Sequence, residues 1–373
     1  MSLFSTLFGK KKDESENIKT PAQKSTNKTP NAPNLHLRGR PDANGLYPSE
    51  LVLLAVAERY KTTETNFPTY SFQKYEIINP QKMLKNLYTR GFLEIGSPID
   101  MLSSFKVAEL KEMASSIGIE ATGKKADIIS ALSSVAPDTL ADYIKERKWK
   151  LTDLGHTALM QNPYIQYFLD PHEYDVTNVG VTIWSVNEDF IKDTKRPYRD
   201  IIYRQLNDQM NKSCIAFQMN PLSGSADTHT YCECYRLMGL FIEEEGKSYI
   251  NASDMYFQYL YKNINIHAAR SLLVGYKLAQ NDKKYQKELI SRYYDNIQLC
   301  PFQRTELLRL IDKLNIDNES VRSALITSFK RADDTGVMSE KEAADFIILE
   351  LSGDVEKSRD LAEKLAKKAV KRI

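Results

Sequence analysis

The spacing of apolar residues ahead of a glycine-lysine-lysine step is the feature that most constrains this chain. Apolar side chains recur there at helical intervals, at Phe105, Leu110, Met113, Ala114 and Ile117. The run Val107-Ala108-Glu109-Leu110-Lys111 consists mostly of good helix formers. We therefore predict a helix that ends at Gly118, so the step that follows is reached from a helix and not from a strand.

The step itself differs at one residue from the sequence pattern of a phosphate-binding loop. Gly118-x4-Gly123-Lys124-Lys125 fits the Walker A pattern, except that Lys125 replaces the hydroxyl residue that would hold magnesium. Such a loop joins a buried parallel strand to a helix, and the element predicted before Gly118 is a helix. Both the context and the chemistry exclude a nucleotide-binding loop here.

The same segment resembles the SAP domain, a small helix-extended-loop-helix module. The resemblance rests on residues in matching order and spacing: Phe105, Val107-Ala108-Glu109-Leu110-Lys111, Gly118-Ile119, Gly123-Lys124-Lys125, Ile128-Ile129 and Leu132. One departure is Ala131, where the family often has an arginine before the closing leucine. The resemblance assigns residues 101–145 to the module and implies DNA binding, often to AT-rich duplex.

The start of the module's second helix is predicted to be an anion site. Thr122 is expected to cap this helix, and Gly123 lets the backbone come close to a ligand. Free N–H groups at a helix start attract anions, and phosphate contacts of this kind do not read base sequence. The predicted nucleic-acid contacts in the module are Thr122, Gly123, Lys124, Lys125, Lys106 and Lys111. The alternative is that Gly123 only separates two packed helices and that the lysines are solvated.

Three predicted helices and a strand precede the module. The first begins at Pro48-Ser49 and ends near Tyr60, and the second lies around Phe67 to Tyr75. The third has Asn79 as N-cap and Pro80 at its first position. Its apolar residues share one face: Met83, Leu84, Leu87 and Tyr88. Gly91 ends this helix, and Phe92 to Ile95 reads as a short strand.

A matching second strand follows the module at Trp149 to Thr152. Leu151-Thr152-Asp153-Leu154-Gly155 resembles the LT-x-x-G signature that closes the wing in many bacterial winged-helix proteins. We therefore predict a winged-helix-like domain over residues 46–100 plus 146–170, with the module inserted at the wing tip, where insertions are tolerated. In a helix-turn-helix the third helix enters the major groove, so its polar face gives four more candidate contacts: Lys82, Lys85, Asn86 and Arg90. A solvated helix face would have a similar composition.

The two ends of the chain have different compositions. Residues 1–45 are predicted to be disordered because they contain few large apolar side chains. Leu3, Phe4, Leu7 and Phe8 share one helical face, which suits either a docking segment or a frayed terminus. Residues 175–373 are predicted to form an α-helical domain, in which Tyr235 to Tyr261 loosely resembles a tetratricopeptide hairpin. Such domains usually hold protein partners. The last predicted helix is basic, either as an interaction face or as a soluble end.

Charge and composition limit the functional classes. The net charge of +2 is not the strong excess that announces nucleic-acid binding by itself, and no apolar run reaches membrane-spanning length. The four cysteines suit a reduced, cytoplasmic chain, and His229-x2-Cys232-x-Cys234 lacks a second half for a metal site. The chain contains no enzyme motif that we recognise. We predict a mainly α, non-enzymatic DNA-binding or DNA-associated protein of bacterial or phage type, with no cofactor, bound to duplex DNA and to a protein partner. The alternative is a protein-interaction scaffold without DNA affinity.

Overall fold

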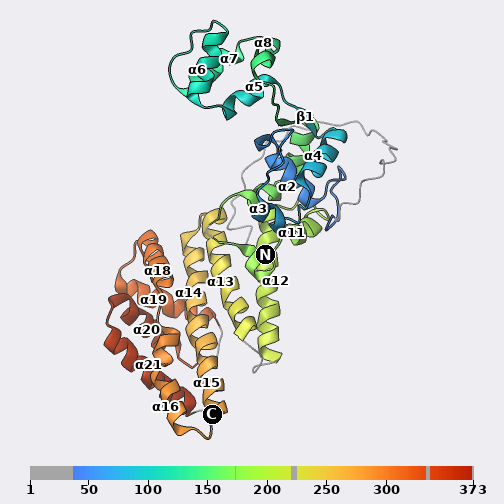
Figure 1. Cartoon of the computed structure of the whole chain (residues 1–373). Coiled ribbons are helices and arrows are strands. Elements are labelled where there is room, and N and C mark those ends of the chain that lie inside the picture. Colours follow the sequence, from blue (N-terminus) through green and yellow to red (C-terminus); the bar gives the residue numbers. More distant parts are fainter. Residues whose placement is uncertain (1–36, 173, 220–224, 333–336, 372–373) are drawn as a thin grey trace. The chain divides into compact units, whose positions relative to one another are not determined.

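The computed structural model describes residues 37–172, 174–219, 225–332 and 337–371, which are mainly helical (Figure 1). They divide into two compact units. The N-terminal unit contains residues 37–171 and 183–198 of this part, and the C-terminal unit contains residues 172–182 and 199–371. The segment predicted to be disordered over residues 1–36, including the apolar face of Leu3 to Phe8, lies outside the described residues.

The N-terminal unit begins with the predicted helices. They are α2 (Pro48–Val56) extended by η1 (Ala57–Arg59), then α3 (Thr69–Lys74) and α4 (Pro80–Thr89). Asn79 caps α4 as predicted, because its side-chain oxygen accepts the N–H of Lys82 at 3.0 Å. Met83, Leu84 and Leu87 are buried. Tyr88 was predicted for the same face but is 44% exposed, and its ring lies against that of Trp149 at a centroid distance of 5.7 Å.

Two short strands pair across a long insertion. Strand β1 (Leu93–Ile95) is antiparallel to β2 (Trp149–Leu151), with Glu94 opposite Lys150. The next helix, α9 (Asp153–Gln161), is capped by Thr152, whose hydroxyl oxygen accepts the N–H of Gly155 at 3.1 Å. A Cβ at Gly155 would lie 2.3 Å from the carbonyl oxygen of Phe92. Only glycine therefore allows α9 to approach β1 this closely, which gives the LT-x-x-G pattern a steric reason.

The inserted segment has a core of its own. It contains α5 (Pro98–Met101), η2 (Leu102–Ser104), α6 (Val107–Ser116), α7 (Lys125–Ser133) and α8 (Pro137–Tyr143). Of the residues predicted from helical spacing, Leu110, Met113 and Ala114 are buried in this core, and Phe105 and Ile117 pack against it partly buried. Residues in or next to elements that the sequence did not predict complete the core: Met101, Leu102, Leu140 and Ile144. The insertion is thus a small helical body with its two ends held together by β1 and β2.

Two predicted boundaries are wrong. Residues 37–45, predicted to be disordered, pack on the N-terminal unit. The Asp42 carboxylate accepts the backbone N–H of Leu46 at 2.9 Å and the side-chain amide of Asn162 at 2.8 Å. Residues 183–198, predicted for the C-terminal domain, belong to the N-terminal unit, because α11 (Ile183–Phe190) packs on α2 and on α10 (Tyr164–Leu169). These contacts join residues that are far apart in the chain, so the local sequence pattern does not predict them.

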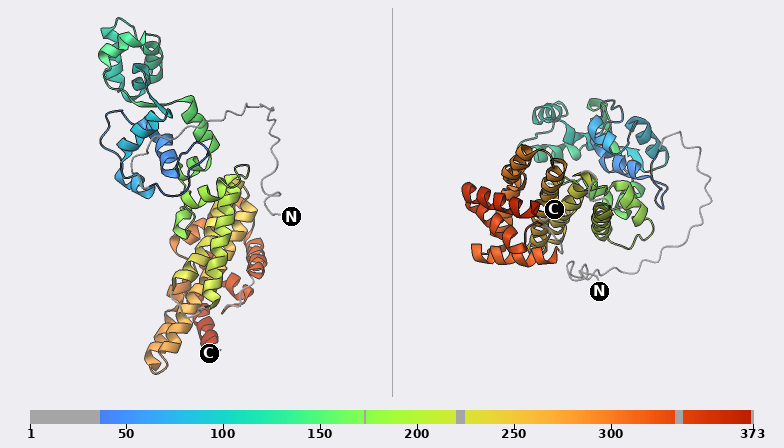
Figure 2. Two further views of the ribbon diagram at one scale, coloured as in Figure 1. Left: turned by 90° about the vertical axis from the view of Figure 1, so that its right-hand side faces the viewer. Right: turned by 90° about the horizontal axis from the view of Figure 1, so that it is seen from below.

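In the described part of the C-terminal unit, all regular elements are helices (Figure 2). In chain order they are η3 (Val176–Val179), α12 (Tyr198–Met219), α13 (Ser225–Gly246), α14 (Tyr249–Lys262), the π-helical η4 (Asn263–His267), α15 (Ala268–Leu278), α16 (Lys283–Ser291), α17 (Tyr293–Ile297), α18 (Pro301–Leu314), α19 (Asn318–Arg331), α20 (Glu340–Ser352) and α21 (Val355–Val370). One core runs from Tyr256 in α14 to Ala369 in α21.

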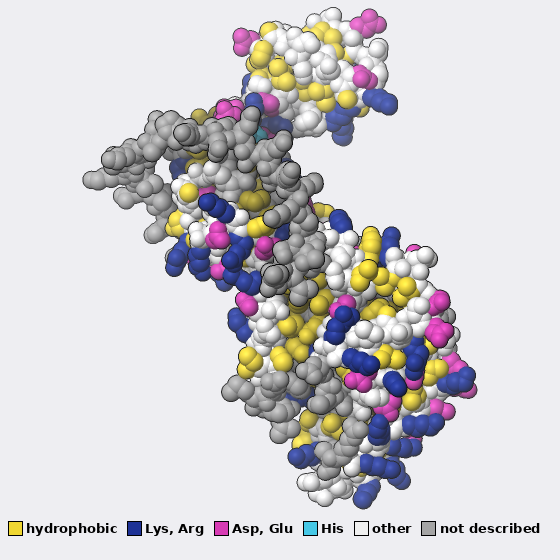
Figure 3. Space-filling model, turned by 180° about the vertical axis from the view of Figure 1, so that it is seen from behind, with side chains coloured by type: hydrophobic (Ala, Val, Ile, Leu, Met, Phe, Trp, Pro, Cys, Tyr) yellow, Lys and Arg dark blue, Asp and Glu magenta, His cyan; other side chains and the backbone are white. Residues whose placement is uncertain are grey.

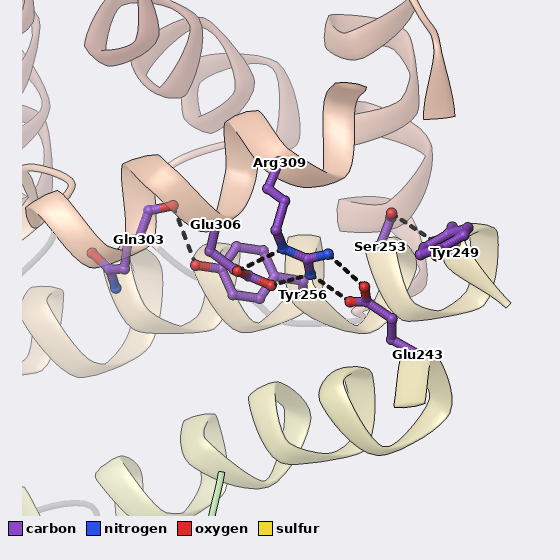
Figure 4. Close-up of polar contacts among 7 residues, drawn as sticks. All are labelled: Glu243, Tyr249, Ser253, Tyr256, Gln303, Glu306 and Arg309. Atoms are coloured by element: carbon purple, nitrogen blue, oxygen red, sulfur yellow. Dashed lines mark hydrogen bonds and ion pairs between the residues drawn. The ribbon is translucent and has the colours of Figure 1, made fainter. Parts of the chain in front are cut away.

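Helices α13 and α14 pack on each other as a helical hairpin in the segment from Tyr235 to Tyr261, and its tetratricopeptide character stays a prediction. A Cβ at Gly239 would lie 3.1 Å from the carbonyl oxygen of Ala252, so the two helices are in close contact there. Arg309 of α18 donates paired hydrogen bonds to Glu306 of the same helix and to Glu243 of α13, and the second pair joins α18 to the hairpin (Figure 4). These two carboxylates raise the pKa of Arg309. The repetition of such hairpins along the unit stays a prediction.

Candidate nucleic-acid interface

The start of α7 is capped differently from the prediction. The helix begins at Lys125, and Lys124 is its N-cap residue, so Thr122 lies two residues outside and does not cap it. The Asp127 carboxylate accepts the backbone N–H of Lys124 at 2.8 Å. An acidic residue at the third helical position can reach back to the N-cap in this way. The signal was present in the sequence as the acid three residues after Lys124.

Gly123 serves this cap. Its φ of +94° is in the left-handed region, and an added Cβ would lie 2.6 Å from Asp127 Oδ2. The glycine therefore makes room for the carboxylate of the chain itself, at the place where the sequence suggested close approach to a ligand. Within the described part of the chain, the backbone N–H groups of Lys125 and Ala126 have no acceptor. These two donors are the part of the predicted anion site that stays open.

The lysines around this helix start differ in their surroundings. Lys124 is exposed, whereas Lys125 is half-buried and donates from Nζ to the carbonyl oxygen of Ser103 at 2.8 Å. Since Ser103 lies three residues before Lys106, this bond holds the start of α7 beside the chain that leads into α6. Lys106, Lys124 and Lys125 are thus brought to one end of the segment. Lys111 is exposed further along α6.

The exposed face of α4 is a second group of candidate contacts. Lys82 and Lys85 are exposed and Asn86 is half-buried; neither lysine forms an ion pair with a described residue. A third exposed polar residue, Thr89, donates its hydroxyl to the carbonyl oxygen of Lys85 at 2.9 Å. This face therefore keeps two free ammonium groups on successive turns.

Arg90 has a structural role that the sequence did not show. Its guanidinium donates to Glu50 Oε1 at 2.7 Å and to the carbonyl oxygen of Gly45 at 2.7 Å. The Glu50 side chain is 1% exposed, and its burial raises its pKa while Arg90 acts in the opposite direction. Arg90 is therefore the counter-charge of a buried carboxylate, and this role corrects its prediction as a nucleic-acid contact.

Comparison with known protein families identifies one segment. Residues 101–133 match the family model of the SAP domain. This segment is a SAP domain. No curated protein and no solved structure matches the chain. The matched residues include α6, α7 and the Gly123-Lys124-Lys125 step between them, whereas α8 lies beyond the match and completes the core.

The SAP domain and α4 are supported by different cores. Ile128 and Leu132 fix α7 on the SAP core, while α4 packs on α2 and β1. Each lysine group is therefore a separate candidate surface with its own support.

Other kinds of site find little support. The described ranges contain no group of three or more His, Cys, Asp or Glu side chains that could hold a metal ion. Cys232 and Cys234 are buried in α13. Burial raises the pKa of the Cys234 thiol to about 12, which keeps it protonated. Among the described helices, none has the length and apolar character needed to cross a membrane.

Proposed function

We propose that this protein binds duplex DNA, without catalysing a reaction on it, through the SAP domain. The observation that carries the proposal is the start of α7 in that domain. It presents two unbonded N–H groups beside the exposed ammonium group of Lys124, with Lys106 held at the same end. Donors and charges of this kind suit phosphate oxygens.

The geometry supports a contact made mainly by lysine side chains. Asp127 occupies one backbone donor and adds a negative charge beside the helix start. In this proposal the side chains of Lys106 and Lys124 hold a phosphate together with the backbone N–H groups of Lys125 and Ala126. The backbone donors alone do not surround it. Contacts of this type carry no base information and weaken with salt. We extend the proposal to AT-rich duplex on the family resemblance alone.

A winged-helix-like body around the SAP domain is the second part of the proposal. Three helices, a pair of antiparallel strands and the glycine-dependent approach of α9 to β1 support it. In this arrangement α4 is the helix that enters the major groove, and Lys82, Lys85 and Asn86 face the bases or phosphates. Arg90 stays with Glu50.

Fluorescence anisotropy of the full chain with a labelled AT-rich duplex across a salt series tests the proposal. We expect Lys106→Ala/Lys124→Ala to weaken binding by roughly tenfold at low salt and to flatten the salt dependence by about 0.9 per lost phosphate contact. The matched control is Lys212→Ala/Lys330→Ala, which removes two exposed lysines from other helices. Absence of duplex binding by the unmodified chain at low salt would contradict the proposal and favour the scaffold alternative.

A protein partner for the C-terminal unit is supported by one apolar groove. A cleft of about 440 Å³ lies between α14, the end of α18 and α19, and its apolar lining includes Ile250, Phe257 and Ile316. Ile250 is 75% exposed at its edge. We propose that a partner buries this side chain. Ile250→Ser should then weaken complexes recovered with the tagged full chain, and the exposed Lys212→Ala variant should not.

A further inference from the structure

Basic residues concentrate on two segments of the C-terminal unit. Residues 277–292 carry five basic and two acidic side chains, and residues 355–371 carry six basic and three acidic ones. Their combined net charge is +6, whereas the whole chain has +2, so the rest of the chain is acidic on balance. Figure 3 shows Lys and Arg side chains gathered over the lower end of this unit, where α15, α16 and α21 lie.

The two segments form one surface. Helix α21 packs on α15, α16 and α17. It turns Ala362, Leu365, Ala366 and Ala369 into the core, and α16 adds the partly buried Leu289 and Ile290 to the same core. The lysines of both helices lie on the opposite, exposed sides. We call this surface, formed by residues 277–292 and 355–371, the basic end.

Some of these charges are neutralised within the chain and others are not. Lys357, Lys367 and Lys368 lie 2.5 to 2.6 Å from the carboxylates of Asp354, Glu363 and Glu342. Six other lysines of the basic end are exposed and have no carboxylate partner among the described residues: Lys277, Lys283, Lys284, Lys287, Lys364 and Lys371. An exposed cluster of uncompensated charge attracts a polyanion.

Helix stability does not explain the lysines of α16. Lys283 and Lys284 occupy its first two positions, where the helix dipole disfavours positive charge. Asp282 compensates locally, because its carboxylate accepts the N–H groups of Lys284 and Tyr285 at 3.0 and 2.9 Å. Lys367, Lys368 and Lys371, by contrast, stand at the end of α21, where the dipole favours them. The stability of α16 therefore does not explain the basic charge at its start, which suggests a role in binding.

We propose that the basic end binds the phosphate backbone of duplex DNA, as a contact in addition to those of the SAP domain and α4; this inference rests on the proposed function. Several unpaired lysines on two adjacent helices match a series of phosphates, which lysine binds as a point charge. A lipid surface fits less well. A membrane-surface helix buries its apolar face in lipid, whereas α21 buries that face in the protein core.

Four versions of the full chain test the inference by anisotropy in the same salt series: the unmodified chain, the SAP variant Lys106→Ala/Lys124→Ala, the basic-end variant Lys283→Gln/Lys287→Gln/Lys364→Gln/Lys371→Gln, and their combination. We expect the basic-end variant to bind roughly tenfold more weakly at low salt, with a salt slope that is shallower by up to about 3.6 if each of the four lysines contacts one phosphate. The matched control for removal of four exposed charges is Lys195→Gln/Lys212→Gln/Lys313→Gln/Lys330→Gln, whose lysines are exposed and lie outside the basic end.

The outcomes separate the two proposals. Loss in the SAP variant alone overturns the basic-end inference and leaves the proposed function standing. Loss in the basic-end variant alone supports the inference and contradicts DNA contact by the SAP domain. No binding by any version overturns both, and binding of the basic end to phosphatidylserine vesicles without binding to duplex overturns the inference. A second measurement uses the unmodified chain, in which duplex should protect Lys283, Lys287, Lys364 and Lys371 from acetylation; equal acetylation with and without duplex would contradict it.

Discussion

At the scale of single residues, Arg90 shows how one sequence pattern can hide two roles. Its position at the end of the polar face of α4 led to the prediction of a DNA contact, yet its guanidinium is bound to Glu50 and Gly45. The deciding fact is the burial of Glu50, forty residues earlier in the chain, and no local pattern reports it. Asn79 is the opposite case, since a cap depends only on residues within one turn and could be predicted.

Replacement of Arg90 should destabilise the fold in a pH-dependent way. Arg90→Ala leaves the buried Glu50 without its counter-charge, which costs about 3 kcal/mol of unfolding free energy near neutral pH. Burial already raises the pKa of Glu50 above 4.5, and loss of Arg90 raises it further. The folded state then holds a proton that the unfolded state releases, so stability falls as the pH rises through that range. Urea denaturation should show a larger loss at about pH 8 than at about pH 5. Lys82→Ala is the control, and an equal loss from Arg90→Ala at both pH values would contradict this account.

Two glycines of the SAP domain should differ in their response to alanine. Gly118 and Gly123 both have positive φ, at +74° and +94°. A Cβ at Gly118 meets nothing within 4 Å, so only the left-handed backbone is strained, at a cost of about 1 kcal/mol. At Gly123 the Cβ also meets the Asp127 carboxylate. We expect Gly123→Ala to lower thermal stability more than Gly118→Ala, and Asp127→Ala to relieve part of that difference in the double variant. Equal losses from the two glycines would contradict the steric role.

At the scale of elements, the sequence predicted those whose signals are local. Helix α4 has its cap, proline and apolar face in sequence order, and β2 with the start of α9 has the LT-x-x-G pattern. Helices α5 and α8 were missed because each is too short to show a period. Residues 37–45 and α11 were misassigned because their order comes from contacts with α2, α9 and α10, which lie far from them in the chain.

At the start of α7, a substitution that weakens the helix cap is expected to strengthen DNA binding. Asp127→Asn keeps the shape of the side chain but removes a negative charge beside the proposed phosphate contact. Two charges about 6 Å apart in water interact by about 0.7 kcal/mol, so duplex affinity should rise by about threefold at low salt. The cap weakens at the same time, so the melting temperature should fall. Asp138→Asn in α8 is the matched control for charge. Unchanged or weaker binding by Asp127→Asn would place the phosphate away from this helix start.

At the scale of the whole molecule, the small net charge of the chain conceals the uneven distribution of its basic and acidic residues. A net charge of +2 argued against strong nucleic-acid binding, yet the basic end alone carries +6. The sequence showed a basic last helix but did not show that α16 lies beside it, because that contact joins segments about seventy residues apart. The proposed DNA contacts therefore lie in both units of the chain: those of the SAP domain and of α4 in the N-terminal unit, and that of the basic end in the C-terminal unit.

DNA contacts in both units of one chain predict that affinity depends on duplex length. Once one contact has bound a duplex, the other meets the same duplex at a high effective concentration, provided that the duplex is long enough for both. A duplex of about 48 base pairs offers more binding positions than one of about 12 base pairs, which alone raises the apparent affinity. The unmodified chain should gain roughly tenfold or more in affinity beyond this statistical increase. The basic-end variant should lose this gain while keeping the statistical part, and the SAP variant should keep only the share of the gain that α4 supplies. Anisotropy titrations at one fixed low salt concentration measure all three chains on both duplexes. If the unmodified chain and the two variants gain equally with length, the contacts do not act on one duplex together.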